Sequence, residues 1–257
     1  DNVFNQTKII ELSTAIDQLI ALTQKYHCVV ANPPYLGSRR MEDEFSTWLK
    51  NNNYADVSRD LYSSFIKRGL QQLEGAGYLG MITQMSWMFT SDFSSFRGKV
   101  INKYFLETAV MLGSGAFETI SGEVVKSVSF TIIKNSSSNN TIFIDASNFS
   151  DKIEGFHKGR RYSRNISIYD KLKGKYFAFK LNENNVNKIS KTKFLSDYLN
   201  IKQGLATGSN DQFLRFPWEV SNKLFISNSS EYSASFKWYP YDKGGGFRKH
   251  FGNNLHV

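Results

Sequence analysis

An apolar run that ends on two consecutive prolines constrains this chain most strongly. Residues 28–31 have the composition of a short strand, and Asn32-Pro33-Pro34-Tyr35 follows them directly. Proline has a fixed backbone φ angle and no N–H, so neither a helix nor a paired strand continues through such a doublet. The sequence therefore predicts a buried strand that stops abruptly where a functional loop begins.

The residue types of this motif suit the transfer of a methyl group to an exocyclic amine. The side-chain carbonyl of Asn32 and the backbone carbonyl of Pro33 can both accept hydrogen bonds from one NH2 group. Two such acceptors draw the amine nitrogen out of conjugation with its ring, so its lone pair can attack a methyl sulfonium. Tyr35 offers a flat face for an extruded base. The alternative is an Asn-Pro turn with a spare aromatic, and the preceding strand favours the functional interpretation.

Hydrophobic periodicity predicts alternating helices and strands over the first 150 residues. Helices are expected at 8–25, 61–73 and 93–105, and strands at 28–31, 78–83, 108–112, 127–134 and 141–145. This order predicts an α/β sheet that is parallel at first and closes with an antiparallel hairpin. Residues 151–180 are rich in Lys and Arg and poor in aliphatic side chains, which indicates a basic connector.

The positive charge of the chain lies in its C-terminal part. Residues 1–150 carry a net charge of −1, whereas residues 151–257 carry +10. Such asymmetry is typical of a polyanion-binding segment attached to a neutral domain. Lys243, Arg248 and Lys249 flank a run of glycines that lets the backbone come close to a ligand, so we expect them to contact DNA phosphates. A solvated basic surface is the alternative.

Composition excludes several classes of protein and site. No apolar run approaches the roughly 18 residues of a membrane span, and the N-terminus has no basic segment typical of a signal peptide. We therefore expect a cytoplasmic protein with no membrane partner. The single cysteine, Cys28, forms no internal disulfide and is expected to be buried in the apolar run. The four histidines lack metal-ligand spacing, so no metal site is expected.

In combination, these motifs resemble the N6-adenine-specific DNA methyltransferases, in particular the PglX-type enzymes of BREX phage defence and related fused restriction-modification methylases. Residues 32–35 match the catalytic motif of that family, 60–65 the helix start that follows it, and 77–87 the next strand and loop. Residues 112–125 resemble the later loop, whose aromatic side chain packs against the flipped adenine. The resemblance gives that role to Phe117.

The resemblance implies a class I, Rossmann-like fold, S-adenosylmethionine as the methyl donor, and double-stranded DNA as the substrate. It makes Asn32, Pro33, Pro34 and Tyr35 catalytic residues, and it places the flipped base between Tyr35 and Phe117. Other phage-defence or restriction subunits are the implied protein partners. Residues 203–211 and 237–249 look like the opening of the target-recognition region of the family.

One departure from the family concerns the cofactor. In the family, a glycine-rich S-adenosylmethionine loop and an acidic residue that holds the ribose precede the catalytic motif. Only 31 residues precede Asn32 here, they have a helical pattern, and there is no initiator Met. We therefore expect an excised piece of a longer enzyme, inactive by itself, with an incomplete cofactor site.

This piece would hold the C-terminal half of the methyltransferase sheet in residues 1–150, a basic connector in 151–180, and the start of a mixed α+β target-recognition region in 181–257. Two alternatives stay open. RNA methyltransferases and protein-glutamine methyltransferases also carry Asn-Pro-Pro-Tyr, although the basic C-terminal part argues against a protein substrate. The second alternative is a non-catalytic DNA-binding module with a vestigial loop.

Overall fold

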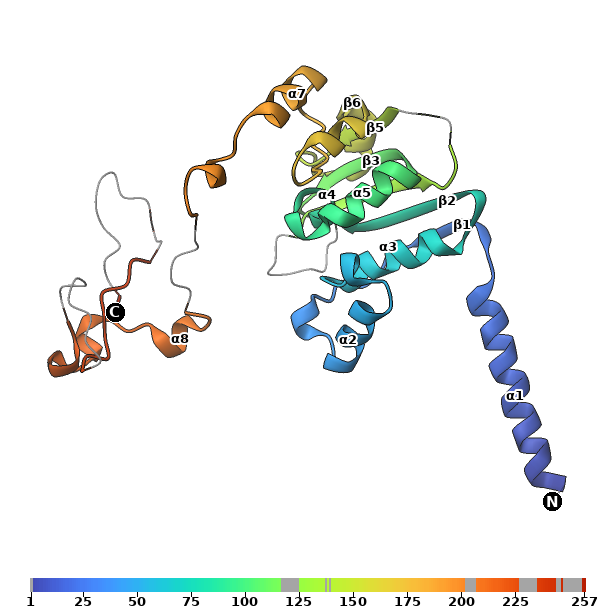
Figure 1. Cartoon of the computed structure of the whole chain (residues 1–257), viewed down its shortest axis with the longest axis horizontal. Helices are drawn as coiled ribbons and strands as arrows, with labels where there is room; N and C mark the ends of the chain where they lie inside the picture. Colours follow the sequence, from blue (N-terminus) through green and yellow to red (C-terminus); the bar gives the residue numbers. More distant parts are fainter. Residues whose placement is uncertain are drawn as a thin grey trace. The chain divides into compact units, whose positions relative to one another are not determined.

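The computed structural model describes residues 2–116, 125–136, 138, 140–201, 207–226, 235–243, 246 and 256–257. The chain divides into two compact units, Asp1–Thr192 and Lys193–Val257, and each is described by itself (Figure 1). The larger unit contains a six-stranded mixed sheet and most of the helices. The α/β class expected from the sequence is confirmed.

The sheet has the strand order β1-β2-β4-β3-β5-β6. Its strands are β1 (Tyr26–Ala31), β2 (Leu73–Gln84), β3 (Phe105–Gly113), β4 (Ser127–Ile133), β5 (Asn140–Asp145) and β6 (Arg160–Asn165). β1 is parallel to β2, and β5 is parallel to β3, whereas β4 is antiparallel to both β2 and β3. An antiparallel pair, β5 with β6, ends the sheet.

The pairing of β5 differs from the hairpin that the sequence suggested between residues 127–134 and 141–145. β2 and β3 occupy both edges of β4, so no edge of β4 is open to β5. β5 instead takes the other edge of β3 and runs parallel to it. Periodicity identifies a strand but does not encode its neighbours.

The helices expected from periodicity are present. The helices are α1 (Asn2–Thr23), α2 (Asp43–Asn51), α3 (Leu61–Gln72), α4 (Ser86–Phe89), α5 (Ser94–Lys103), α6 (Lys152–Lys158), α7 (Glu183–Lys191) and α8 (Asn210–Phe213). Asp60 caps the N-terminus of α3, since its side chain accepts a hydrogen bond from the backbone of Tyr62 at 3.4 Å. The sequence analysis missed the short helices α2, α6 and α7.

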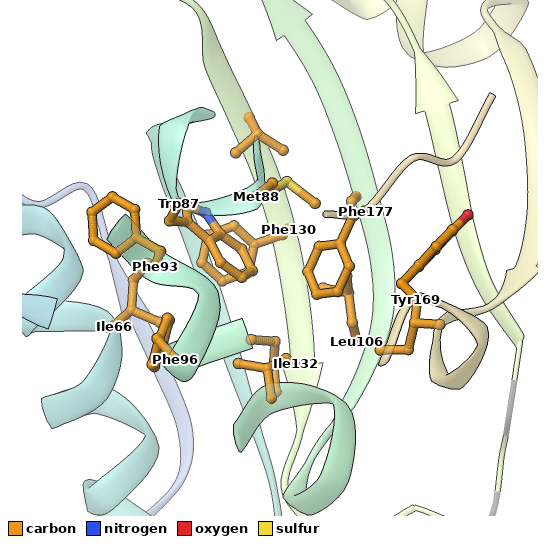
Figure 2. Close-up of a cluster of buried hydrophobic side chains, with 14 of the residues drawn as sticks. Ile66, Trp87, Met88, Phe93, Phe96, Leu106, Phe130, Ile132, Tyr169 and Phe177 are labelled. Carbon is orange, nitrogen blue, oxygen red and sulfur yellow. The ribbon is translucent and has the colours of Figure 1, made fainter. Parts of the chain in front are cut away.

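Aromatic side chains dominate the core of the larger unit (Figure 2). Trp87 is fully buried, and its ring centroid lies 5.0 Å from that of Phe130 and 5.8 Å from that of Phe177. Close aromatic packing of this kind adds to the free energy gained by apolar burial. Trp87 comes from α4, Phe130 from β4 and Phe177 from the segment that follows β6, so the cluster joins distant parts of the chain.

Residues 151–180, expected to be a connector, pack onto the sheet instead. They form α6, β6 and a 3-10 helix, Ile166–Lys171. Their buried side chains are Ile166, Ile168, Tyr169, Leu172, Phe177 and Phe179. The segment has few aliphatic residues, but its aromatic side chains supply the apolar area that burial requires.

The expectation that residues 28–31 form a buried strand is wrong. β1 lies at the edge of the sheet, pairs with β2 only among the described strands, and leaves Cys28 exposed and Val30 77% exposed. An apolar run has the same pattern at the edge of a sheet as at its centre, so the sequence could not distinguish the two.

α1 is also exposed. Its exposed apolar side chains are Ile9, Ile10, Leu12, Ile16, Leu19, Ile20 and Leu22. The backbone of its last turn accepts a hydrogen bond from Arg68 of α3. No helix in the described part of the chain is both long and apolar enough to cross a bilayer.

The smaller unit is built from short elements. α8 and 3-10 turns lead to isolated bridges between Phe225 and Trp238 and between Tyr241 and His256. The backbones of Arg215 and Val257 exchange two hydrogen bonds, of 2.9 and 3.0 Å.

Candidate active site

The carboxyl ends of four strands meet at one edge of the sheet. β1, β2, β3 and β5 all run in the same direction, because β2 and β3 are both antiparallel to β4. Asn32 follows β1, Gln84 ends β2, Gly113 ends β3 and Asp145 ends β5. This edge of an open α/β sheet is where ligands usually bind.

The predicted catalytic motif lies at this edge, directly after β1. Asn32 and Pro34 are exposed, Pro33 is buried and Tyr35 is half-buried. The side-chain amide of Asn32 is therefore accessible to a substrate, while the buried ring of Pro33 fixes the turn.

The Asp60 carboxylate holds the loop that follows the motif. One of its oxygens accepts a hydrogen bond from the backbone of Leu36 at 3.0 Å. The backbone of Leu61 in turn donates to the carbonyl of Leu36 at 3.0 Å, and that of Ser38 donates to the carbonyl of Arg59 at 2.9 Å. Burial raises the pKa of Asp60, although the backbone N–H donors oppose this shift. Sequence analysis assigned Asp60 only to a helix start, so its role in the loop was missed.

Aromatic contacts orient Tyr35. Its ring meets the ring of Tyr62 edge-on, with centroids 5.9 Å apart and an interplanar angle of 77°. The Tyr62 hydroxyl lies 2.7 Å from Ser86 Oγ in a hydrogen bond that ties α3 to α4. Burial raises the pKa of both tyrosines above the ordinary value.

The hydroxyl groups of Tyr35 and Ser127 are both buried. They lie near each other without regular hydrogen-bond geometry, and neither has another hydrogen-bond partner in the described part of the chain. Ser127 begins β4, so these two hydroxyls lie where the loop of the predicted catalytic motif approaches that strand.

Tyr35 lines a cleft of about 830 Å³. Asp60, Gln84 and Ser86 contribute to its wall, whereas Asn32 lies outside this lining. The volume falls in the usual range for small-molecule and cofactor sites.

Three arginines and two aspartates line the same cleft and give it a net positive charge that the sequence analysis did not identify. Arg39 and Arg40 are exposed on a short 3-10 helix after the motif. Arg59 pairs with Asp92 at 2.8 Å. The adjacent pair Arg39-Arg40, shortly after the motif, was the sequence signal from which these charges could have been predicted.

The remaining predicted site residues lie outside the described residues or in the smaller unit. Phe117, Arg248 and Lys249 lie outside the described residues. Lys243 is half-buried in the smaller unit. Among the residues that the structure describes, no cluster of three His, Cys, Asp or Glu side chains could hold a metal ion.

Sequence comparison bears on the motif. Residues 1–117 match the family model for the Eco57I restriction-modification methylase. The chain is 28% identical over 251 residues to adenine-specific methyltransferase PglX of Lacticaseibacillus casei (strain Zhang). It is 31% identical over 254 residues to adenine-specific methyltransferase BrxX of Escherichia coli O9:H4 (strain HS).

These alignments cover 92% and 96% of this chain but only 21% and 20% of the two relatives. The chain therefore spans about a fifth of the length of the curated relatives it matches. The resemblance to PglX-type adenine-specific methyltransferases that the sequence predicted is confirmed.

Two solved structures match part of the chain. The M protein of the type I restriction enzyme EcoKI matches with a TM-score of 0.37 at 18% identity, over 48% of this chain and 26% of that one. DrdV in complex with DNA matches with a TM-score of 0.45 at 15% identity, over 68% of this chain and 20% of that one.

Proposed function

We propose, on the premise that this chain is a relative of the adenine-specific methyltransferases PglX and BrxX, that it forms the catalytic-loop part of a DNA methyltransferase. The full-length protein would transfer a methyl group to the N6 amine of an adenine flipped out of DNA. The observation that carries the proposal is the position of Asn32-Pro33-Pro34-Tyr35 at the carboxyl end of β1, beside a cationic cleft.

Asn32 and Pro33 would bind the amine. The exposed Asn32 amide oxygen and the Pro33 carbonyl would each accept one N6 hydrogen, which raises the nucleophilicity of the nitrogen. No other general base is needed, because the nitrogen loses a proton readily once methylation makes it positive. The ring of Tyr35, oriented by Tyr62, would stack on the adenine, and Phe117 would pack on it too.

S-adenosylmethionine would supply the methyl sulfonium, and we infer that this chain holds only part of its site. In support, Gly75, Gly77 and Gly80 lie inside β2 and not in a loop between a strand and a helix, which is where a glycine-rich cofactor loop lies. The isolated 257-residue chain should show little or no methyl transfer.

The exposed edge of β1 and the exposed side chains of α1 support a larger catalytic domain in the full-length protein. Leu19 is 63% exposed and Val30 is 77% exposed. Open strand edges and large apolar surfaces are normally covered in folded proteins. We propose that the part holding the cofactor covers this surface.

The charge of the cleft favours nucleic acid as the substrate. Arg39 and Arg40 are exposed beside Tyr35, whereas Arg59 is paired with Asp92, and guanidinium groups bind phosphates well. A protein glutamine would gain nothing from these charges. We further propose that residues 181–257 begin the DNA target-recognition region, and that Lys243, Arg248 and Lys249 contact phosphates there. Cytoplasmic restriction or phage-defence subunits would be the protein partners.

The test is methylation of DNA by the full-length protein with labelled S-adenosylmethionine. Nucleosides from digested DNA would be identified by mass spectrometry, and RNA and glutamine-containing peptides would be assayed in parallel. Labelled N6-methyladenine from the wild type, absent in Asn32→Ala, is the expected result. Label in RNA or in peptides only, or no transfer at all, would contradict the proposal.

A further inference from the structure

A second pocket, of about 480 Å³, opens at the same edge of the sheet. One wall separates it from the Tyr35 cleft. In that wall, the backbone N–H of Met85 donates to the carbonyl of Lys126 at 2.8 Å. Gln84 and Ser86 line the Tyr35 cleft, whereas Met85 and Lys126 line the second pocket.

Apolar and aromatic side chains form the floor of this pocket. They are Met85, Phe89, Met111, Phe177, Phe179 and Leu181. Phe179 is buried, and its ring stacks on that of Phe143 at 5.1 Å with an interplanar angle of 9°. The ring of Tyr162 meets Phe179 edge-on at 5.4 Å. The half-buried ring of Phe89 packs on Phe179 with centroids 6.4 Å apart, so this buried stack gives an accessible ring of the floor a rigid support.

Cationic and polar groups form the rim. Asp145 binds Lys180 at 2.6 Å and accepts a hydrogen bond from Ser147 Oγ at 2.6 Å. Arg160 lies opposite Asp145 in the register of β5 and β6. Lys126 and Lys180 line the pocket together with this one carboxylate, so the lining carries a net positive charge that favours an anion.

Asp145 stays ionised at neutral pH. Partial burial raises its pKa, but the hydrogen bonds from Lys180 and Ser147 outweigh this effect and lower the pKa below its ordinary value. Its charge is therefore already neutralised by Lys180, and the side chain of Lys126 remains as the excess positive charge of the lining.

Two arginines hold the wall formed by residues 174–181. The buried Arg97 of α5 donates to the carbonyl of Lys175 at 3.0 Å and also to that of Gly174. Arg164 of β6 donates through Nε to the carbonyls of Phe179 and Leu181, each at 3.0 Å. The pocket is therefore preformed, which lowers the cost of ordering on binding.

We propose that this pocket holds one nucleobase of the DNA substrate other than the methylated adenine, with the phosphate of that nucleotide beside Lys126. The proposal rests on the proposed function, since it takes DNA as the substrate. A base would stack on the aromatic floor, and Ser147 and Asn148 at the rim could bind its polar edge. The shared wall at Met85 places this base close to the flipped adenine.

The experiment uses the full-length protein and duplexes that carry 5-iododeoxyuridine at one position at a time around the methylated adenine. Photocrosslinked peptides would be identified by mass spectrometry. We expect one position away from the target to crosslink within residues 174–181. Protection of this segment by free deoxynucleoside monophosphates or by S-adenosylmethionine, with no crosslink from DNA, would overturn the proposal in favour of a small-molecule site.

Three variants complete the test. Ala178→Leu narrows the pocket and should abolish that crosslink, and Lys126→Gln, at the exposed rim, tests the phosphate without disturbing the core. Each should raise the KM for DNA by about tenfold with little change in kcat, as expected for the loss of one stacking or phosphate contact. Lys188→Gln, at an exposed lysine outside the pocket, should leave KM unchanged.

The outcomes distinguish this proposal from the proposed function. If the wild type does not methylate DNA, the proposed function fails. If it methylates DNA, but no crosslink forms in residues 174–181 and Lys126→Gln has a normal KM, only the pocket proposal fails.

Discussion

The Asp60 carboxylate accepts a hydrogen bond from the backbone N–H of Leu36 at 3.0 Å. The same carboxylate caps α3, so one side chain fixes both the start of a helix and the loop that follows the catalytic motif. The position of Tyr35 in its cleft thus depends on a residue that is distant in sequence.

Asp60→Ala should therefore lower both stability and activity. We expect the unfolding free energy to fall by about 1–3 kcal/mol, from the lost cap and the unpaired Leu36 N–H. Asp60→Asn keeps an acceptor and should recover most of both properties. Denaturant unfolding and kcat of the full-length protein would be measured for each. Equal losses in the two variants would show that the hydrogen bonds are not the cause.

Asn32→Ala should reduce methyl transfer by about 10²–10³, the usual effect of removing one positioned polar group from an active site. Affinity for DNA should change little, because Asn32 is exposed at the strand end and contributes a single side chain. Asn184→Ala, at an exposed asparagine of α7, is the matched control. Turnover of Asn32→Ala near the wild-type rate would remove Asn32 from the mechanism.

Tyr35→Ala should weaken binding of the flipped base by about 1–3 kcal/mol, since a stacking surface is lost. Tyr35→Phe keeps the ring and removes a hydroxyl that makes no regular hydrogen bond among the described residues. That variant should bind DNA normally and should be as stable as the wild type or slightly more stable. Affinity for a duplex with a mismatched target and the melting temperature would be compared.

Phe117→Ala should likewise weaken binding of the mismatched duplex and leave the melting temperature nearly unchanged. A lower melting temperature with unchanged affinity would instead assign Phe117 to the core.

The Asp56 carboxylate should make the unfolding free energy depend on pH in acid. It is 8% exposed and binds Lys67 at 2.9 Å and Lys99 at 2.8 Å. Burial raises its pKa, but the two lysines outweigh this effect and lower the pKa below the ordinary 3.8. A carboxylate with a lowered pKa stabilises the fold when the pH is above its ordinary pKa. This contribution is lost as the pH falls through the lowered pKa of the folded protein.

The difference in unfolding free energy between wild type and Asp56→Asn should therefore shrink as the pH falls below about 4. At neutral pH, the variant should lose about 3–5 kcal/mol, because buried Lys67 keeps a charge without its partner. Asp170→Asn removes a pair whose aspartate is 44% exposed, and should cost under about 1 kcal/mol. A constant difference across this pH range would assign the effect to packing.

Replacement of Lys243, Arg248 and Lys249 by Ala should weaken binding to duplex DNA at every sequence. Each lost phosphate contact should reduce the salt slope of binding by about one unit. Affinity would be measured across a series of salt concentrations. An unchanged slope would contradict the phosphate role, and an altered site preference would mean that Arg248 contacts base edges.

The sequence pattern predicted the fold class and the loop at Asn32-Pro33-Pro34-Tyr35, but it did not predict which strands are neighbours in the sheet. The doublet Pro33-Pro34 located the end of β1 because proline chemistry is local. The edge position of β1 and the insertion of β4 depend on pairing between distant segments, which periodicity does not encode.

The buried Arg97 could not be predicted for a related reason. An isolated arginine in a helix is normally a surface residue. Here burial lowers its pKa to about 10, so it stays charged at neutral pH, and backbone carbonyls replace the water around it. The proximity of the Tyr35 and Ser127 hydroxyls could not be predicted either, because the two residues are distant in sequence and come together only in the folded chain.

Residues 174–181 are held in place through their backbone, whereas their side chains line the second pocket. Arg97 and Arg164 bind this segment by carbonyl groups that every amino acid carries. Exchange of the side chains at Ala178 or Lys180 would leave those bonds in place. The lining of the second pocket can therefore be changed at these positions while the backbone that carries it stays in place.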